Sequence, residues 1–199
     1  MTRRASLLAG LAPAAALAVA MTATPAAAAT DPGFLDASNL PKQTGVDWFA
    51  GPVTAGTPDP LPFCYGQSLP GATSVHRAFW TDLDTSAVQV TIVERDEQRA
   101  KDLAALLNKA VRTCASRTQA QDPGTTARYR SLGHLKVEEG VTLHGVRTST
   151  ESSKDVHLFA VGRDGRTVTV VSWGRMGTFA DAPVPAFKQT AREAVRKLY

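Results

Sequence analysis

The chain has 199 residues, of which 43% are hydrophobic and 20% charged, and its formal net charge at neutral pH is +4. This length suits one domain with a sizeable core. The charge is too small and too evenly spread for a surface built around nucleic acid or an anionic membrane.

Residues 1–29 have the composition of a secretory signal peptide. Arg3 and Arg4 precede an apolar, alanine-rich run over 7–21, and alanines fill the last positions. This is the order of basic, apolar and small residues in such leaders, and the run is too short for a transmembrane helix. We therefore expect cleavage after Ala29 and export by the Sec route or, since the arginines are paired, the twin-arginine route.

The mature protein is expected to be secreted, monomeric and without a membrane span, lipid anchor or cofactor. No cysteine precedes Cys64, so no lipid-bearing cysteine can stand at the cleavage site, and no second apolar segment follows the leader. Cys64 and Cys114 form the only possible pair, which in an oxidising compartment is most simply a disulfide. A reactive thiol is the alternative, but Cys114 is expected near the C-terminal end of a helix, where the dipole disfavours a thiolate.

Residues 30–69 are rich in proline and glycine and are expected to wrap the surface as an N-terminal arm, with one short helix around 34–39. Trp48 and Phe49 would hold this arm against the body. Residues 70–199 are expected to form a single domain.

The domain begins with a predicted hairpin of strands 74–80 and 87–94, the second of which has hydrophobic residues at alternate positions. A helix is predicted over 97–116, because its apolar residues recur at spacings of three and four. Asp96 is its expected N-cap. Shorter strands follow at 129–137 and 141–147.

The last predicted hairpin turns at Asp164-Gly165, a typical two-residue turn. Closing it there places Arg163 and Arg166 opposite each other at a solvated tip. The segment is not a phosphate-binding loop, because its glycine leads into a strand and not into a helix. An amphipathic helix closes the chain over 184–198.

Both faces of this last hairpin are apolar. The second face carries Val156, Leu158, Val171 and Trp173, and exposing it to water would be unfavourable. Either the arm covers it, with Trp48 as the expected contact, or it forms a groove for an apolar ligand or peptide. The arm is favoured because its proline-rich residues must pack somewhere.

Each half of the chain contains a hairpin followed by an amphipathic helix. Two helices can cover one face of a sheet, and short connections give antiparallel pairing. The sequence therefore predicts a two-layer α+β domain, in which both helices pack on one face of a twisted antiparallel sheet, with one disulfide.

The order of short motifs resembles a known family. "ASNLP", Trp48, "GPV", "PFC" at Cys64, the helix ending in Cys114, "VGRDG" and Trp173 are similar to secreted actinobacterial proteins of the PknH-like extracellular sensor domain type. The resemblance implies an exported domain with two helices against an antiparallel sheet, a ligand bound in a cleft, and no enzymatic activity. The chain departs from the kinase-linked members in having no kinase domain or membrane anchor, and two cysteines in place of four.

Candidate catalytic and metal-binding groups are few. The histidines at 76, 134, 144 and 157 lack the spacing of a metal site, and the acid pairs at 82/84 and 138/139 fall in predicted turns. Ser172 lacks the preceding glycine of a nucleophile elbow. It would nevertheless lie opposite His157 in the expected register, with Asp155 nearby, which leaves a serine–histidine pair as an alternative.

The leading hypothesis is a secreted, non-catalytic binding or sensor-like domain for an unidentified small molecule, peptide or envelope component. One alternative is a cell-envelope hydrolase that uses His157 and Ser172. Another is a purely structural exported protein.

Overall fold

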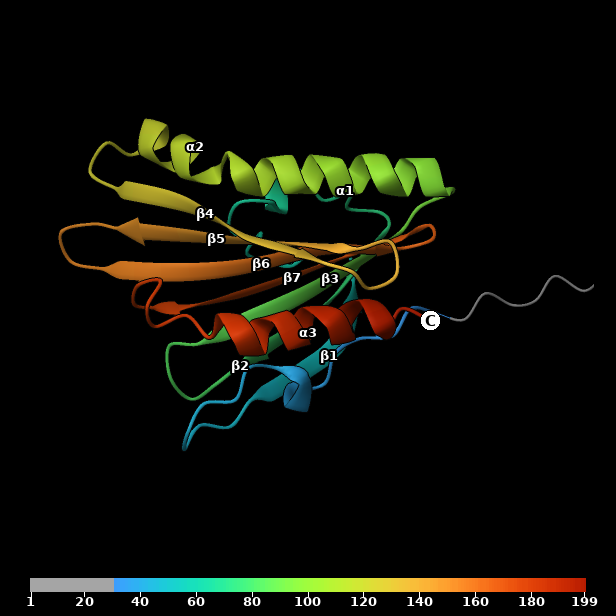
Figure 1. Ribbon diagram of the computed structural model, residues 1–199, viewed down its shortest axis with the longest axis horizontal. Coiled ribbons are helices and arrows are strands. Elements are labelled where there is room, and N and C mark those ends of the chain that lie inside the picture. Colours follow the sequence, from blue (N-terminus) through green and yellow to red (C-terminus); the bar gives the residue numbers. More distant parts are fainter. Residues whose placement is uncertain (1–30) are drawn as a thin grey trace, which may run out of the picture.

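The computed structural model describes residues 31–199 (Figure 1). The expected signal peptide, with its cleavage point at Ala29, lies outside the described residues. The strands are β1 (Phe49–Ala55), β2 (Ser74–Trp80), β3 (Ser86–Val93), β4 (Thr126–Leu135), β5 (Val141–Ser149), β6 (Lys154–Asp164) and β7 (Thr167–Met176). The helices are α1 (Glu97–Arg112), α2 (Cys114–Gln121) and α3 (Val184–Arg196), with single 3₁₀ turns at Ala37–Asn39 and Gly66–Ser68.

All seven strands form one antiparallel sheet in the order β1-β2-β3-β7-β6-β5-β4. The pairing of β3 with β7 joins the two halves of the chain. The predicted α+β class and antiparallel sheet are therefore confirmed.

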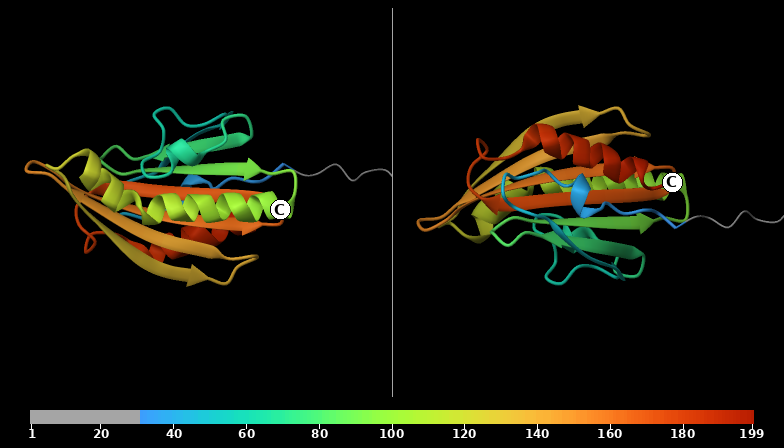
Figure 2. Two further views of the ribbon diagram at one scale, coloured as in Figure 1. Left: turned by 90° about the horizontal axis from the view of Figure 1, so that it is seen from above. Right: turned by 90° about the horizontal axis from the view of Figure 1, so that it is seen from below.

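The helices lie on opposite faces of the sheet, so the expectation that both cover one face is wrong (Figures 1 and 2). On one face, Leu103, Leu107 and Val111 of α1 pack in a core with Phe159 and Val161. On the other, α3 packs against the alternate residues of β6 and β7 through its buried Phe187, Ala191, Ala194 and Val195, and Leu198 just beyond the helix adds to this core. Because the central strands are apolar on both sides, each face needs its own cover, and the domain has three layers.

The N-terminal arm is part of the fold and does not only wrap the surface. Its β1 pairs with β2 at the edge of the sheet, and Leu35 and Leu40 are buried in the core beneath α3. The backbone N–H of Leu35 donates to the side-chain oxygen of buried Gln89 (2.7 Å). These contacts make the arm continuous with the sheet, and the expected boundary at residue 70 does not separate them.

The helix predicted over 97–116 is interrupted. It begins as expected, since Asp96 Oδ1 accepts the backbone N–H of Arg99 (2.8 Å), but it ends at Thr113. The Thr113 hydroxyl donates to the carbonyl of Lys109 (3.0 Å), a bond that often accompanies a bend. Cys114 therefore begins α2 and does not lie in the last turn of α1.

The register of the β6–β7 hairpin differs from the expected one by two residues. Asp164 pairs with Thr167, so Gly165 and Arg166 form the turn. Gly165 has φ +51° and Arg166 has no positive φ, which suits a turn with glycine at its first central position. Because the shift is even, every side chain keeps its expected face.

Candidate functional site

A cleft of about 410 Å³ opens on the α1 face of the sheet, at the ends of β3, β6 and β7. His157, Phe159 and Ser172 form its floor, and residues 60–63 form a wall. Asp84 and Asp155 stand at its rim. Arg175 also lines the cleft, so an aromatic and imidazole interior lies beside two acidic groups and one basic group.

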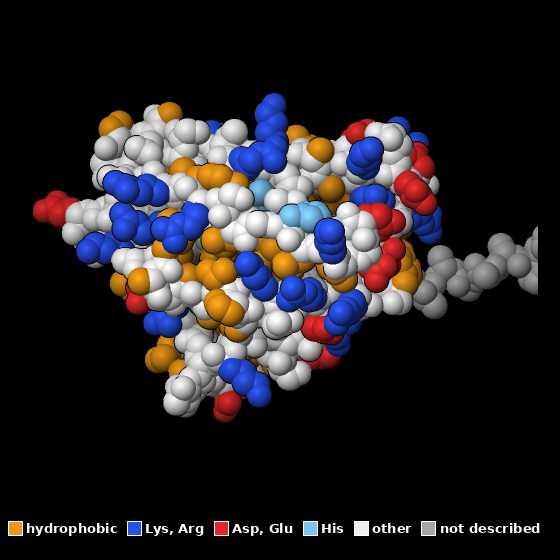
Figure 3. Space-filling model, viewed as in Figure 1, with side chains coloured by type: hydrophobic (Ala, Val, Ile, Leu, Met, Phe, Trp, Pro, Cys, Tyr) orange, Lys and Arg blue, Asp and Glu red, His pale blue; other side chains and the backbone are white. Residues whose placement is uncertain are grey.

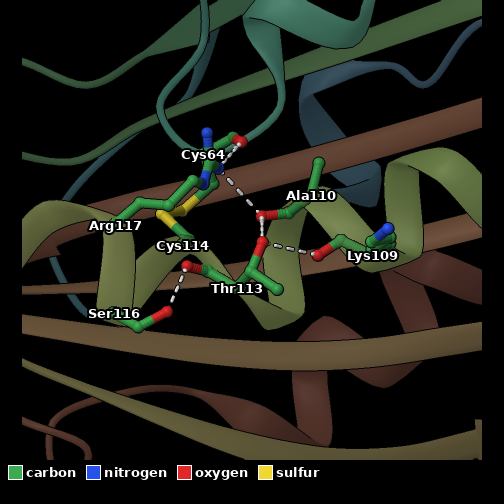
Figure 4. Close-up of a disulfide and its surroundings, with 7 residues drawn as sticks. All are labelled: Cys64, Lys109, Ala110, Thr113, Cys114, Ser116 and Arg117. Carbon is green, nitrogen blue, oxygen red and sulfur yellow. Dashed lines mark hydrogen bonds between the residues drawn. A yellow bond between two sulfur atoms is a disulfide. The ribbon is translucent and has the colours of Figure 1, made fainter.

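The wall of the cleft is held by the disulfide between Cys64 and Cys114, whose Cα atoms are 5.1 Å apart (Figure 4). Arg117 of α2 strengthens this junction, because its Nη2 donates to the carbonyls of Cys64 (2.7 Å) and Ala110 (3.0 Å). The predicted disulfide is confirmed. It fixes the loop beside the cleft to the junction of α1 and α2.

Tyr65 attaches the same loop to the floor. Its side chain is fully buried, its ring meets Phe159 edge-on at 6.1 Å, and its hydroxyl lies 3.1 Å from Ser172 Oγ. Burial raises the pKa of Tyr65, against a smaller opposing effect of the Ser172 hydrogen bond. The phenol therefore stays protonated and holds the serine hydroxyl in a hydrogen bond.

His157 lies between two aromatic rings, with ring centroids 4.8 Å from Phe63 and 6.3 Å from Phe159. Gly174, opposite it on β7, makes room for the imidazole, because a Cβ there would lie 2.7 Å from Nδ1. Burial lowers the pKa of His157, although Asp155 opposes this. A neutral imidazole has one donor and one acceptor nitrogen, and neither bonds to another residue of the described chain.

Comparison with protein-family models, curated proteins and solved structures finds no match for this chain. The resemblance to sensor domains therefore rests on the sequence pattern.

The expected cross-strand pairing of His157 with Ser172 is wrong. Both residues line the cleft, but Phe159 is opposite Ser172 and Gly174 is opposite His157. The serine hydroxyl is engaged by Tyr65 instead. Sequence reasoning missed the part played by Phe63 and Tyr65, although their position beside Cys64 placed them in a loop that the disulfide would constrain.

The second face of the last hairpin is covered, so it is not a groove. Val156, Leu158, Val171 and Trp173 are each no more than 1% exposed. The expected arm contributes Leu35 and Leu40, and Trp48 packs partly buried against this core while its Nε1 donates to the carbonyl of Pro41 (2.9 Å). Helix α3, expected on the other face, supplies much of the cover.

His144 is held by neighbouring side chains on the α1 face of the sheet. Buried His144 lies between the hydroxyl of Tyr129 (2.9 Å from Nδ1) and Oδ1 of Asn108 (2.7 Å from Nε2).

Across residues 31–199, no three side chains of His, Cys, Asp or Glu converge as a metal site. Within the same range, no helix has the length and apolar character needed to cross a membrane.

Proposed function

We propose that this chain is an exported, non-catalytic binding domain of the sensor type, and that its ligand occupies the cleft floored by β3, β6 and β7. The observation that carries the proposal is the His157 ring, held between Phe63 and Phe159 with both nitrogens unbonded to other described residues. Pockets that are mostly apolar, with a few convergent polar groups, are typical ligand sites.

The lining indicates the chemistry of the ligand. Aromatic rings favour a flat apolar group, and His157 offers a donor and an acceptor for one polar substituent. Asp84 and Asp155 outnumber Arg175 among the charged residues that line the cleft, which favours a neutral or cationic ligand over an anion. We therefore propose a small, partly aromatic molecule with at least one hydrogen-bonding group.

Export fits the disulfide that shapes the cleft, because such bonds persist in oxidising compartments. A larger hollow of about 690 Å³ lies beside residues 31–34. It adjoins the point where the described chain begins, so we assign it no function.

A thermal-shift screen of small aromatic and heteroaromatic compounds against the mature protein tests the proposal. A compound that raises the melting temperature of the wild type should lose its effect in Phe63→Ala and His157→Gln. Phe49→Ala is a matched control, because Phe49 is 41% exposed and Phe63 is 38% exposed, and Phe49 lies on β1 away from the cleft. Stabilisation that survives both cleft variants would place binding elsewhere.

Turnover assays and thermal-shift measurements on the same mature protein distinguish the alternative functions. A cell-envelope hydrolase would turn over ester or amide substrates and lose that turnover in Ser172→Ala. A purely structural protein would show neither turnover nor ligand-dependent stabilisation. The hydrogen bond between Ser172 and Tyr65 favours binding over hydrolysis, because a nucleophilic serine needs an adjacent general base.

A further inference from the structure

Arginines gather on the α3 face of the sheet, opposite the cleft. Arg128 on β4 lies directly across from Arg147 on β5. Arg130 follows two residues after Arg128 and therefore projects from the same face. Figure 3 shows Lys and Arg side chains gathered at this end of the sheet.

This arginine cluster, defined as Arg128, Arg130 and Arg147, has no compensating acid in contact. Within residues 31–199, none of its members forms an ion pair within 4.0 Å. Asp181, in the segment before α3, already accepts hydrogen bonds from the backbone N–H and the hydroxyl of Thr178 (2.7 and 2.8 Å). Like charges directly opposite each other destabilise a sheet, so the cluster carries a cost that an anion would remove.

Arg147 adds a second, independent observation. Its Nε is buried and has no hydrogen-bond partner among the described residues. A buried donor without an acceptor is unfavourable, and the penalty is larger for a charged group. The Nε–H group of Arg147 therefore has no acceptor among the described residues around it.

The segment before α3 forms a wall over the cluster. Phe179 lies over Gly145, where a Cβ would come within 2.8 Å of the ring. The guanidinium of Arg130 stacks on the same ring, 4.4 Å from its centroid, which holds this flexible side chain in one orientation. Arg128, Arg130, Arg147 and Phe179 line a hollow of about 380 Å³.

We propose that this hollow is an anion site for a phosphate-bearing ligand with at least two negative charges. Planar guanidinium groups bind phosphate oxygens in pairs, and several converging arginines match a multiply charged group better than a single carboxylate. The volume exceeds that of one water-sized group many times over, so it accommodates two linked phosphates or a phosphate ester. The site is separate from the cleft, and each proposal can fail without the other.

Calorimetric titration of the mature protein with pyrophosphate, in low-salt buffer without phosphate, tests this site. Binding should weaken as salt is added, because exposed charges are screened. Arg147→Met should lower the affinity at least tenfold, and Arg130→Gln several-fold. Lys188→Gln on α3 removes the same charge outside the hollow and should change the affinity less than twofold.

Two further arms complete the experiment. Arg128→Gln, at an exposed position, should also weaken binding and serves if Arg147→Met does not fold. Titration with glycerol 3-phosphate distinguishes the ligand source: comparable affinity for the ester indicates a phosphorylated organic ligand, and preference for pyrophosphate indicates a free polyphosphate. Absence of binding by both probes at millimolar concentration would overturn the proposal. Equal loss of affinity in Lys188→Gln and Arg130→Gln would do the same, because it would show only a general charge effect.

Discussion

The hydroxyls of Tyr65 and Ser172 lie 3.1 Å apart, although 107 positions separate these residues in the chain. The bond joins the loop that walls the cleft to the strand that floors it. Since Tyr65 is fully buried, its hydroxyl depends on this partner. The cleft and the stability of the fold are therefore linked through one hydrogen bond.

The Tyr65–Ser172 bond should show coupling in a double-mutant cycle. Ser172→Ala leaves a buried phenol unpaired and should lower the free energy of unfolding by about 1–3 kcal/mol. Adding Tyr65→Phe should recover part of this loss, because both partners are then removed. Urea unfolding of the four proteins measures the coupling; purely additive effects would contradict the bond.

Reduction should destabilise the mature protein. The Cys64–Cys114 bridge spans 50 positions and contributes about 4 kcal/mol on chain-entropy grounds. Dithiothreitol should therefore lower the melting temperature, and the Cys64→Ser, Cys114→Ser double variant should match the reduced protein without responding to the reagent. Free-thiol titration of the denatured, unreduced protein should find no thiol, and two reactive thiols per chain would disprove the bridge.

The two arginines near the last turn should differ in their effect on stability. Arg163, with a side chain 18% exposed, lies 3.8 Å from Glu139 Oε1 and donates to the carbonyl of Gly165, whereas Arg166 is exposed. Arg163 is therefore not a solvated tip residue as the sequence predicted. Arg163→Ala should cost about 1 kcal/mol more than Arg166→Ala in urea unfolding. Equal costs would show that the contacts of Arg163 with Glu139 and with the Gly165 carbonyl together contribute nothing to stability.

The cover of the second sheet face should depend more on α3 than on the arm. Phe187 is fully buried, and Phe187→Ala should cost about 3–5 kcal/mol. Trp48 packs only partly buried, so Trp48→Ala should cost less, about 1–2 kcal/mol. Chemical unfolding and binding of an apolar dye measure both variants. A larger cost for Trp48→Ala would make the arm the principal cover.

Stability should fall in mild acid because of His144. Burial, aided by Arg112, lowers the pKa of His144 from 6.5 to about 4. Below pH 6.5 His144 binds a proton in the unfolded chain but not in the folded protein. The free energy of unfolding therefore falls as the pH drops toward 4. The slope is at most about 1.4 kcal/mol per pH unit.

Urea unfolding between pH 7 and 4.5 checks this dependence, with His144→Gln as the variant that should flatten the slope. Burial also lowers the pKa of His157, and His157→Gln therefore measures the contribution of that group separately. If His144→Gln had the same pH dependence as the wild type, the buried neutral imidazole would be excluded as its source.

Local patterns were enough to place several elements. The strand predicted over 74–80 has the observed bounds of β2, Ser74–Trp80, and Asp96 marked the start of α1, because turn signals and helix capping involve only near neighbours in the chain. The disulfide followed from having one possible pair of cysteines. The two apolar faces of the last hairpin were also correct, since an even shift in register preserves side-chain direction.

Contacts between distant segments decided the rest. The face that each helix covers depends on how β3 joins β7, and local periodicity does not encode that pairing. Long-range contacts also bring Tyr65 to Ser172 at the cleft. By contrast, the alignment of Arg128 with Arg147 comes from the hairpin of the consecutive strands β4 and β5. The sequence thus determined which side chains point the same way along each strand, whereas the tertiary structure determined which strands and loops meet. The free energy that selects this strand order comes from burying both faces of one sheet at once.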